Sequence, residues 1–390
     1  MRWQNNIKQV YFLTLRKTIK IYAKFTRTLA IKVIKMTDSI EDIYIDYLIC
    51  SFGAVTATGL SAMLDGAISH DKITRKLSKP VPTSKAHWLR VKPFVRQIES
   101  DDGVLIIDDS IDEKPYTDES PLICWHYDHS KDCSIKGINF ISALYHSQEV
   151  SLPVGVHLVV KSDYETDTKT GKRKRKALFS KNHYARHLMA QAVQNKIRFR
   201  TILMDIWYGS AENIKFIRHE LDKHCITPLK GNRKVALSLE DKKQRKYQRV
   251  ETLLLEENQT KEVWLEGIDF PLVLAKQVFT NEDGSTGILY LVSSDTELKY
   301  ERITSLYQKR WQVECYHKSL KQNASLEKSP TQTRTTQMNH FFYSLYAYVK
   351  LESLKITTRL NHFALRNKLY IKAIQQAFTE LQKLQNSVVA

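Results

Sequence analysis

A helix-forming stretch in the second half of the chain carries one acid, one phenol and several cations at regular spacing. Residues 301–321 contain no Gly or Pro and are rich in helix formers, so they predict a single helix of about six turns. On that helix, five side chains fall within an arc of about 80°: Tyr307, Arg310, Glu314, Lys318 and Lys321. A lone carboxylate among cations is what a metal-assisted phosphoryl-transfer site presents to a nucleic acid. An exposed charged face with pairs such as Arg310–Glu314 predicts the same spacing.

The order Tyr307-x2-Arg310-x3-Glu314-x6-Lys321 resembles a known family at every position. It matches the Y-R-E-K signature of IS4-type DDE transposases, and the pair Arg310-Trp311 resembles the RW pair within that signature. The resemblance implies that Glu314 is the third catalytic carboxylate. It implies that the Tyr, the Arg and the Lys hold transposon-end DNA, and we expect Lys318 to join them. Two upstream aspartates should then follow one hydrophobic strand each.

The first upstream acid follows an apolar run of buried-strand type. Val104–Ile107 ends in two carboxylates, Asp108 and Asp109. An acid just past a central strand either caps the next element or binds something at the edge of the sheet. The resemblance favours the second role. Asp108 follows the apolar run directly, whereas Asp109-Ser110 resembles the D-[ST] form of relatives, so both stay candidates for the catalytic residue and Asp108 is the preferred metal ligand.

The second upstream acid repeats the same arrangement. Thr201–Met204 is an apolar run that ends in Asp205, and Tyr208 then completes a sequence resembling the D-x-x-[YF] motif of the family. The resemblance therefore implies that Asp205 is the second catalytic carboxylate. The resemblance covers roughly residues 105–321 and is sharpest in the last fifteen of them.

The elements that must position these acids predict an α/β protein. The resemblance implies an RNase H-like catalytic core with a β-rich insertion, a helical N-terminal region and a helical C-terminal tail. Strand-like runs at Gly137–Tyr145 and Ser151–Val160 suit the early hairpin of such a core. The expected divisions are a basic N-terminal extension (1–35), a helical DNA-binding region (36–100), the core (101–225 and 293–330), the insertion (226–292) and a helical C-terminal region (331–390).

Composition restricts the classes of partner. The chain has 390 residues, a formal net charge of +18 and a sequence pI near 9.5, which favours a polyanionic partner. No apolar run approaches ~20 residues, so we expect no membrane span. The five cysteines are scattered without C-x-x-C spacing, which argues against structural zinc or a disulfide framework and fits the cytoplasm, with nucleoid association if DNA is bound.

Three basic segments are candidates for DNA contact. Residues 1–35 contain no acid, and they suit a DNA-contacting arm, a membrane-surface helix or translated upstream sequence with the true start at Met36. Residues 169–176 predict a compact basic loop, whereas residues 230–233 lie in the insertion. The expected DNA-binding residues of the last two segments are Lys172, Arg173, Lys174, Arg175, Lys230 and Arg233. Trp264, within the insertion, is expected in the core rather than on DNA.

The resemblance implies Mg²⁺-dependent cleavage and strand transfer at the ends of an insertion sequence. Two Mg²⁺ ions, with Mn²⁺ as a substitute, would be held by Asp108, Asp205 and Glu314. The implied partners are double-stranded DNA, as terminal inverted repeats and target, and a second subunit in a homodimer. A nuclease or resolvase without strand transfer and a non-catalytic DNA-binding relic remain alternatives. The apolar faces of the C-terminal helices suit either completion of the core or pairing with another subunit.

Overall fold

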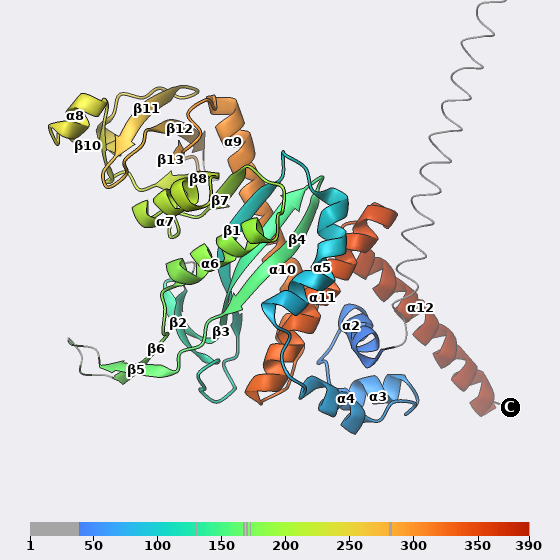
Figure 1. Cartoon of the computed structure of the whole chain (residues 1–390). Helices are drawn as coiled ribbons and strands as arrows, with labels where there is room; N and C mark the ends of the chain where they lie inside the picture. The colour runs from blue at the N-terminus through green and yellow to red at the C-terminus, as the bar shows by residue number, and fades with distance from the viewer. Residues whose placement is uncertain are drawn as a thin grey trace, which may run out of the picture.

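The computed structural model describes residues 39–128, 131–166, 168, 171, 173–280 and 283–389. The basic segment 1–35 therefore lies outside the described residues, as does Lys172. Within the described ranges a mixed sheet runs through the molecule, and helices cover both of its faces (Figure 1). None of the helices in these ranges is long and apolar enough to cross a membrane.

The central strands have the order expected of an RNase H-like core. β1 (Val104–Glu113) pairs antiparallel with β3 (Cys133–Ser147), and β3 pairs antiparallel with β4 (Val150–Leu158). On the other side of β1, β7 (Thr201–Met204) and then β8 (His224–Leu229) add in parallel. The order is therefore β4-β3-β1-β7-β8, with the first parallel strand beside β1. The short strand β2 (Cys124–Asp128) pairs with the early half of β3.

The residues predicted to form an insertion continue this sheet instead of forming a separate one. β13 (Thr286–Ser293) pairs antiparallel with β8, and β12 (Leu272–Thr280) pairs with β13. The outer strands then follow in the order β11, β9, β10. Their bounds are β9 Lys234–Ala236, β10 Gln248–Arg249 and β11 Thr260–Leu265, with the short helix α8 at Leu239–Lys243. The apolar run at the start of β12 is buried, which is why this edge does not separate from the core.

Alternation along β1 divides the interior into two cores. Val104 and Ile106 pack on one face of the sheet, and Leu105 and Ile107 pack on the other. The second face is covered by α5 (Ser84–Ile98) and α6 (Lys181–Gln194). Beyond β7, this core also includes side chains of α7 (Ala211–Lys215) and of the π-helical turn that follows it.

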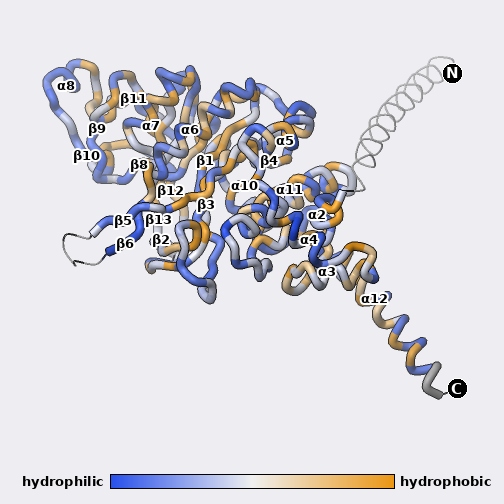
Figure 2. The backbone as a smooth tube through the Cα atoms, turned by 60° about the horizontal axis from the view of Figure 1, so that its bottom comes forward, coloured by the Kyte–Doolittle hydropathy of each residue, from blue (hydrophilic) through white to orange (hydrophobic). Residues whose placement is uncertain are grey.

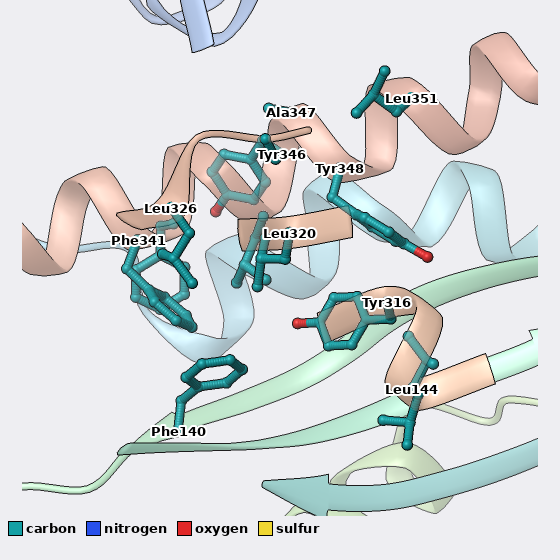
Figure 3. Close-up of a cluster of buried hydrophobic side chains, with 14 of the residues drawn as sticks. Phe140, Leu144, Tyr316, Leu320, Leu326, Phe341, Tyr346, Ala347, Tyr348 and Leu351 are labelled. Atoms are coloured by element: carbon teal, nitrogen blue, oxygen red, sulfur yellow. The ribbon is translucent and has the colours of Figure 1, made fainter. Parts of the chain in front are cut away.

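The first face is covered by aromatic-rich helices from the end of the chain. α10 (Gln312–Gln322) and α11 (Arg334–Thr358) form this cover, and Figure 3 shows Tyr316 and Leu320 of α10 between side chains of β3 and of α11. The rings of Tyr316 and Tyr348 meet edge to face with centroids 4.9 Å apart. This packing fixes α10 against the sheet, and α10 carries the third predicted acid.

The N-terminal helices share this core instead of standing apart from it. Each begins at a Ser or Thr whose side chain accepts a backbone N–H, including Ser39, the predicted N-cap. Tyr44 of the first helix packs on α11 and lies 3.0 Å from Nδ1 of His340. The bounds are α2 Ile40–Cys50, α3 Ala57–Met63 and α4 His70–Leu77, before α5.

The last helix, α12 (His362–Val389), leaves the body of the protein and projects into solvent (Figures 1 and 2). Its root is fixed by a buried polar network around Glu352 of α11. The carboxylate accepts the backbone N–H of Ser151 at 3.0 Å and lies 3.1 Å from Nε2 of His362. The other ring nitrogen of His362 lies 2.7 Å from Oγ of Ser319 on α10. Four elements, β4, α10, α11 and α12, therefore meet at one point.

Candidate active site

Asp108 and Asp205 come side by side because of the register of two parallel strands. β1 and β7 pair Ile106 with Leu203 and Ile107 with Met204, so the next positions on the two strands are the two aspartates. Asp205 directly follows the last residue of β7, and its carboxylate accepts the backbone N–H of Ile206 at 2.6 Å. The sequence pattern of an apolar run ending in an acid thus leads to one place on the sheet.

The helical segment that carries Arg310 and Glu314 is not one uninterrupted α-helix. The expected stretch 301–321 consists of α9 (Tyr300–Gln308), a 3₁₀ turn at Lys309–Trp311 and then α10. The prediction of continuous α-helix was therefore wrong at these three residues, because a tighter turn connects two helices that pack separately. A 3₁₀ turn inside a helix is a frequent sign of a functional or strained position. Here the turn contains Arg310.

Arg310 lies among the three predicted acids. Its Nη1 is 3.3 Å from Oδ2 of Asp108 and 3.6 Å from Oε1 of Glu314. Burial works against the charge of the guanidinium, but Tyr307, Asp108, Asp205 and Glu314 together raise the pKa of Arg310. Asp205 is therefore also near enough to act on it. A single cation balances a group of three carboxylates contributed by β1, the end of β7 and α10.

Asp108 is strongly affected by its surroundings. Burial raises the pKa of its carboxyl to about 8, and the negative charges of Asp109 and Glu314 add to that effect while Arg310 opposes it. A buried carboxylate beside further carboxylates is stable in its charged form only when a cation is close. Arg310 provides that cation in this structure.

Asp109 points to the opposite face of β1 and is saturated with donors. Its carboxylate accepts Tyr208 Oη–H at 2.7 Å and Asn139 Nδ2–H at 2.8 Å, and it pairs with Lys181 Nζ at 2.7 Å. Burial alone would raise the pKa of Asp109, but Lys181 and the other two donors outweigh it and lower that pKa. Asp109 thus lies away from Arg310 and Glu314. Tyr208, from the predicted D-x-x-Y motif, serves Asp109 and not Asp205.

The remaining members of the helical stripe separate in space. Tyr307 lies near Arg310, with the guanidinium carbon 5.9 Å from the ring centroid. Lys321 donates to the backbone carbonyl of Ile111 at 2.7 Å, at the far end of β1. Lys318 is exposed and lies 5.4 Å from the ring centroid of Phe363 on α12. The structure therefore brings Tyr307 and Arg310 to the carboxylates and Lys321 to the same strand, whereas Lys318 faces the last helix.

The expected basic loop at 169–176 is in part a strand. β6 (Arg173–Lys176) pairs with β5 (Asp163–Thr166), because alternating long side chains share the ring of Tyr164. The guanidinium carbons of Arg173 and Arg175 lie 4.1 Å and 4.8 Å from that ring. Arg175 also pairs with Glu119 at 2.8 Å, so part of its charge is already balanced. Lys174 lies on the same strand.

Lys230 and Arg233 follow β8 in a turn near the second acid. Lys230 lies 5.0 Å from the ring of Trp207, which is half exposed and only two residues after Asp205. Trp311, next to Arg310, is more exposed still, at 64 %. Sequence reasoning missed both tryptophans, although an exposed Trp adjacent to a predicted catalytic residue is the signal that could have found them. Trp264 is half-buried and packs under Lys242, 4.5 Å from its ring centroid.

The donor set suits a hard divalent cation in its chemistry. Asp108, Asp205 and Glu314 supply only carboxylate oxygens, which Mg²⁺ and Mn²⁺ prefer. In the described part of the chain, however, no three His, Cys, Asp or Glu side chains are spaced to hold a metal ion. At this site Arg310 occupies the space between the carboxylates. The residues therefore fit such a cation once the guanidinium has moved away.

Comparison with known proteins gives the family. A family model described as "DDE superfamily endonuclease" matches residues 34–252, which is more than half of the chain. That match contains Asp108 and Asp205 and ends before Glu314. The chain is also similar to the solved structure "Drosophila P element transposase strand transfer complex", with 12 % identity and a TM-score of 0.21, over 48 % of this chain and 40 % of that chain. No curated protein matches. On the family match, the chain belongs to the DDE superfamily endonucleases.

Proposed function

We propose that the protein is an IS4-type DNA transposase that cleaves the ends of an insertion sequence and joins them to target DNA. The observation that carries the proposal is the group of three carboxylates around Arg310, since Arg310 and Glu314 belong to the Y-R-E-K segment and Asp108 to the strand before it. An endonuclease of the DDE superfamily needs acids at the ends of adjacent strands and on one helix. The register of β1 and β7 supports that arrangement here.

Asp108, Asp205 and Glu314 would hold divalent cations, Mg²⁺ with Mn²⁺ as a substitute. Two such ions, when bound, stabilise the attacking and leaving oxygens of an in-line displacement at phosphorus. The carboxylates themselves neither attack nor transfer a proton. Asp109 is assigned a positioning role through Tyr208, Asn139 and Lys181.

Arg310 would exchange its carboxylate partners for a DNA phosphate. A guanidinium can clamp a phosphate with two parallel hydrogen bonds, and a phosphate near the site competes directly with Asp108 for it. Departure of Arg310 leaves three carboxylates without a counter-ion, which favours metal binding at that moment. DNA binding and metal binding therefore support each other in this scheme, and free protein holds metal weakly.

The surrounding segments complete the proposal. Residues 36–100 and the hairpin β5–β6 would contact DNA, with Lys230, Arg233, Lys321 and Lys318 as further phosphate contacts. The core would comprise 101–225 and 293–330, the insertion 226–292 and the C-terminal region 331–390. Double-stranded DNA, as terminal inverted repeats and target, is the proposed substrate, and a homodimer the proposed state in the complex.

The test is Glu314→Gln, assayed with Mg²⁺ on terminal-repeat DNA. The substitution removes a ligand charge, so cleavage should fall by at least about 10³-fold, while DNA binding stays equal or becomes slightly stronger. Supplying a pre-cut 3′-hydroxyl end then separates strand transfer from simple cleavage. Cleavage by Glu314→Gln at the wild-type rate would refute the site. Cleavage without joining would assign the protein to the nucleases instead.

A further inference from the structure

The outer part of α12 carries an apolar stripe with no partner in the described chain. Its side chains are Tyr370, Ile371, Ile374, Phe378, Leu381 and Leu384. They are between 44 % and 64 % exposed, close to the most that a helix residue can expose. Large apolar side chains in one continuous exposed row mark a protein or membrane interaction surface. Figure 2 shows the alternation of apolar and polar residues along this helix.

The spacing of the stripe is that of a helix pair. Ile371, Ile374, Phe378 and Leu381 follow one another at intervals of three, four and three residues, which is the a/d pattern of a coiled coil. The stripe from Tyr370 to Leu384 is about 21 Å long at the α-helical rise. A helix of this kind is only marginally stable in water by itself, so its apolar face needs a cover.

The charges of the helix select the kind of cover. The positions that flank the stripe are uncharged: Gln375, Ala377 and Gln382, beside Tyr370 and Leu384. Lys372, Glu380 and Lys383 lie on the opposite face. No cation borders the stripe to attract nucleic acid or an anionic membrane, and no acid borders it to attract a basic segment such as residues 1–35. A second, equally uncharged stripe fits without repulsion.

We propose that α12 pairs with α12 of a second copy of this chain, and that this contact forms in the absence of DNA. The six side chains expose on the order of 500 Å² per copy, so pairing would bury on the order of 1,000 Å², about the lower limit for a specific interface. The distance of the stripe from the root of the helix leaves room for a second protein body (Figure 1). The pairing does not depend on the proposed function and is tested separately from it.

The experiment compares the mass of the full-length chain and two charge-matched variants by sedimentation equilibrium at tens of micromolar, without DNA. Phe378→Lys places a cation inside the stripe, and we expect its dimer to be at least about tenfold weaker. Gln376→Lys places the same charge on the polar face, where a lysine can still pair with Glu380 at i+4, and should leave the dimer unchanged. Equal circular dichroism spectra and melting curves show that both variants are folded.

Each outcome decides the matter. A wild-type dimer weakened by Phe378→Lys and not by Gln376→Lys supports the pairing of the two stripes. A wild-type chain that is monomeric at this concentration overturns it and leaves an internal segment or another protein as the cover. A dimer that is equally strong in Phe378→Lys also overturns it, because the contact then lies elsewhere.

Discussion

Asp108 and Asp109 are neighbours in the sequence and differ in nearly everything else. Their side chains are similarly buried, at 13 % and 20 % exposure. Asp108 faces other acids and one arginine, and its pKa rises to about 8, whereas Asp109 faces three donors and its pKa falls. Burial is common to both, so the partners across each face of β1 decide the difference. One carboxylate is left in need of a cation, and the other has its charge already satisfied.

The largest effect expected from this comparison is on catalysis. Asp108→Asn removes a proposed metal ligand and should lower Mg²⁺-dependent cleavage by at least about 10³-fold. Asp109→Asn should lower it far less, since that side chain lies away from Arg310. The measurement is single-turnover cleavage of terminal-repeat DNA by the two variants at matched protein concentration. The comparison fails if Asp109→Asn is the more damaging change while its fold is intact.

The next effect is on metal affinity. Arg310→Met removes the guanidinium from among the carboxylates without adding a donor, so the free protein should bind Mn²⁺ about tenfold more tightly than wild type. Calorimetry in the absence of DNA measures this directly, and Lys309→Met, the adjacent change, serves as the control. An unchanged Mn²⁺ affinity would mean that Arg310 does not compete with metal.

The two acids should also have opposite effects on stability as pH changes, measured by denaturant unfolding in EDTA. The raised pKa of Asp108 means that the folded state holds its proton longer than the unfolded state, so its contribution to stability falls as pH rises from about 4 to about 8. Asp108→Asn should therefore gain on wild type by on the order of 2 kcal/mol between pH 5 and pH 8.

For Asp109 the sign reverses. Its lowered pKa means that its contribution is fully present above the ordinary value of 3.8 and is lost as pH falls below it. Asp109→Asn should be less stable than wild type by about 1–3 kcal/mol at neutral pH, because Lys181 and Tyr208 lose a partner. Between pH 5 and pH 8 that deficit should stay constant. A deficit that instead shrinks steadily as pH rises would contradict the assignment.

The smallest effect concerns DNA affinity. Lys321→Ala should weaken binding of terminal-repeat DNA and lower the salt slope by about one unit, if Lys321 leaves the carbonyl of Ile111 for a phosphate. Lys318→Ala should change the slope less, since Lys318 lies over Phe363 of the last helix. Binding across a salt series compares the two. Equal slopes for both variants would show that the position relative to the acids is irrelevant to phosphate contact.

The sequence was informative where chemistry depends on local pattern. An apolar run ending in an acid predicted both the strand and the place of Asp108 and Asp205, because a central strand must be apolar and its end must be polar. The Y-R-E-K spacing located Arg310 and Glu314 on one segment.

Contacts between distant residues were beyond sequence reasoning. Nothing local shows that Lys181 and Asn139 satisfy Asp109, since they come from α6 and β3. The 3₁₀ turn at Lys309–Trp311 arises from the separate packing of α9 and α10, and the continuity of β8 with β13 arises from strand pairing across more than sixty residues.

The polar network at the root of α12 has a mechanical consequence. A helix of 28 residues is about 42 Å long, so a rotation of about 5° at its root moves its tip by about 4 Å. Glu352 holds that root through His362 and is itself held by Ser151 of β4. The aim of the whole lever thus depends on a few buried polar atoms, and the same atoms connect it, through Ser319, to the helix that carries Glu314.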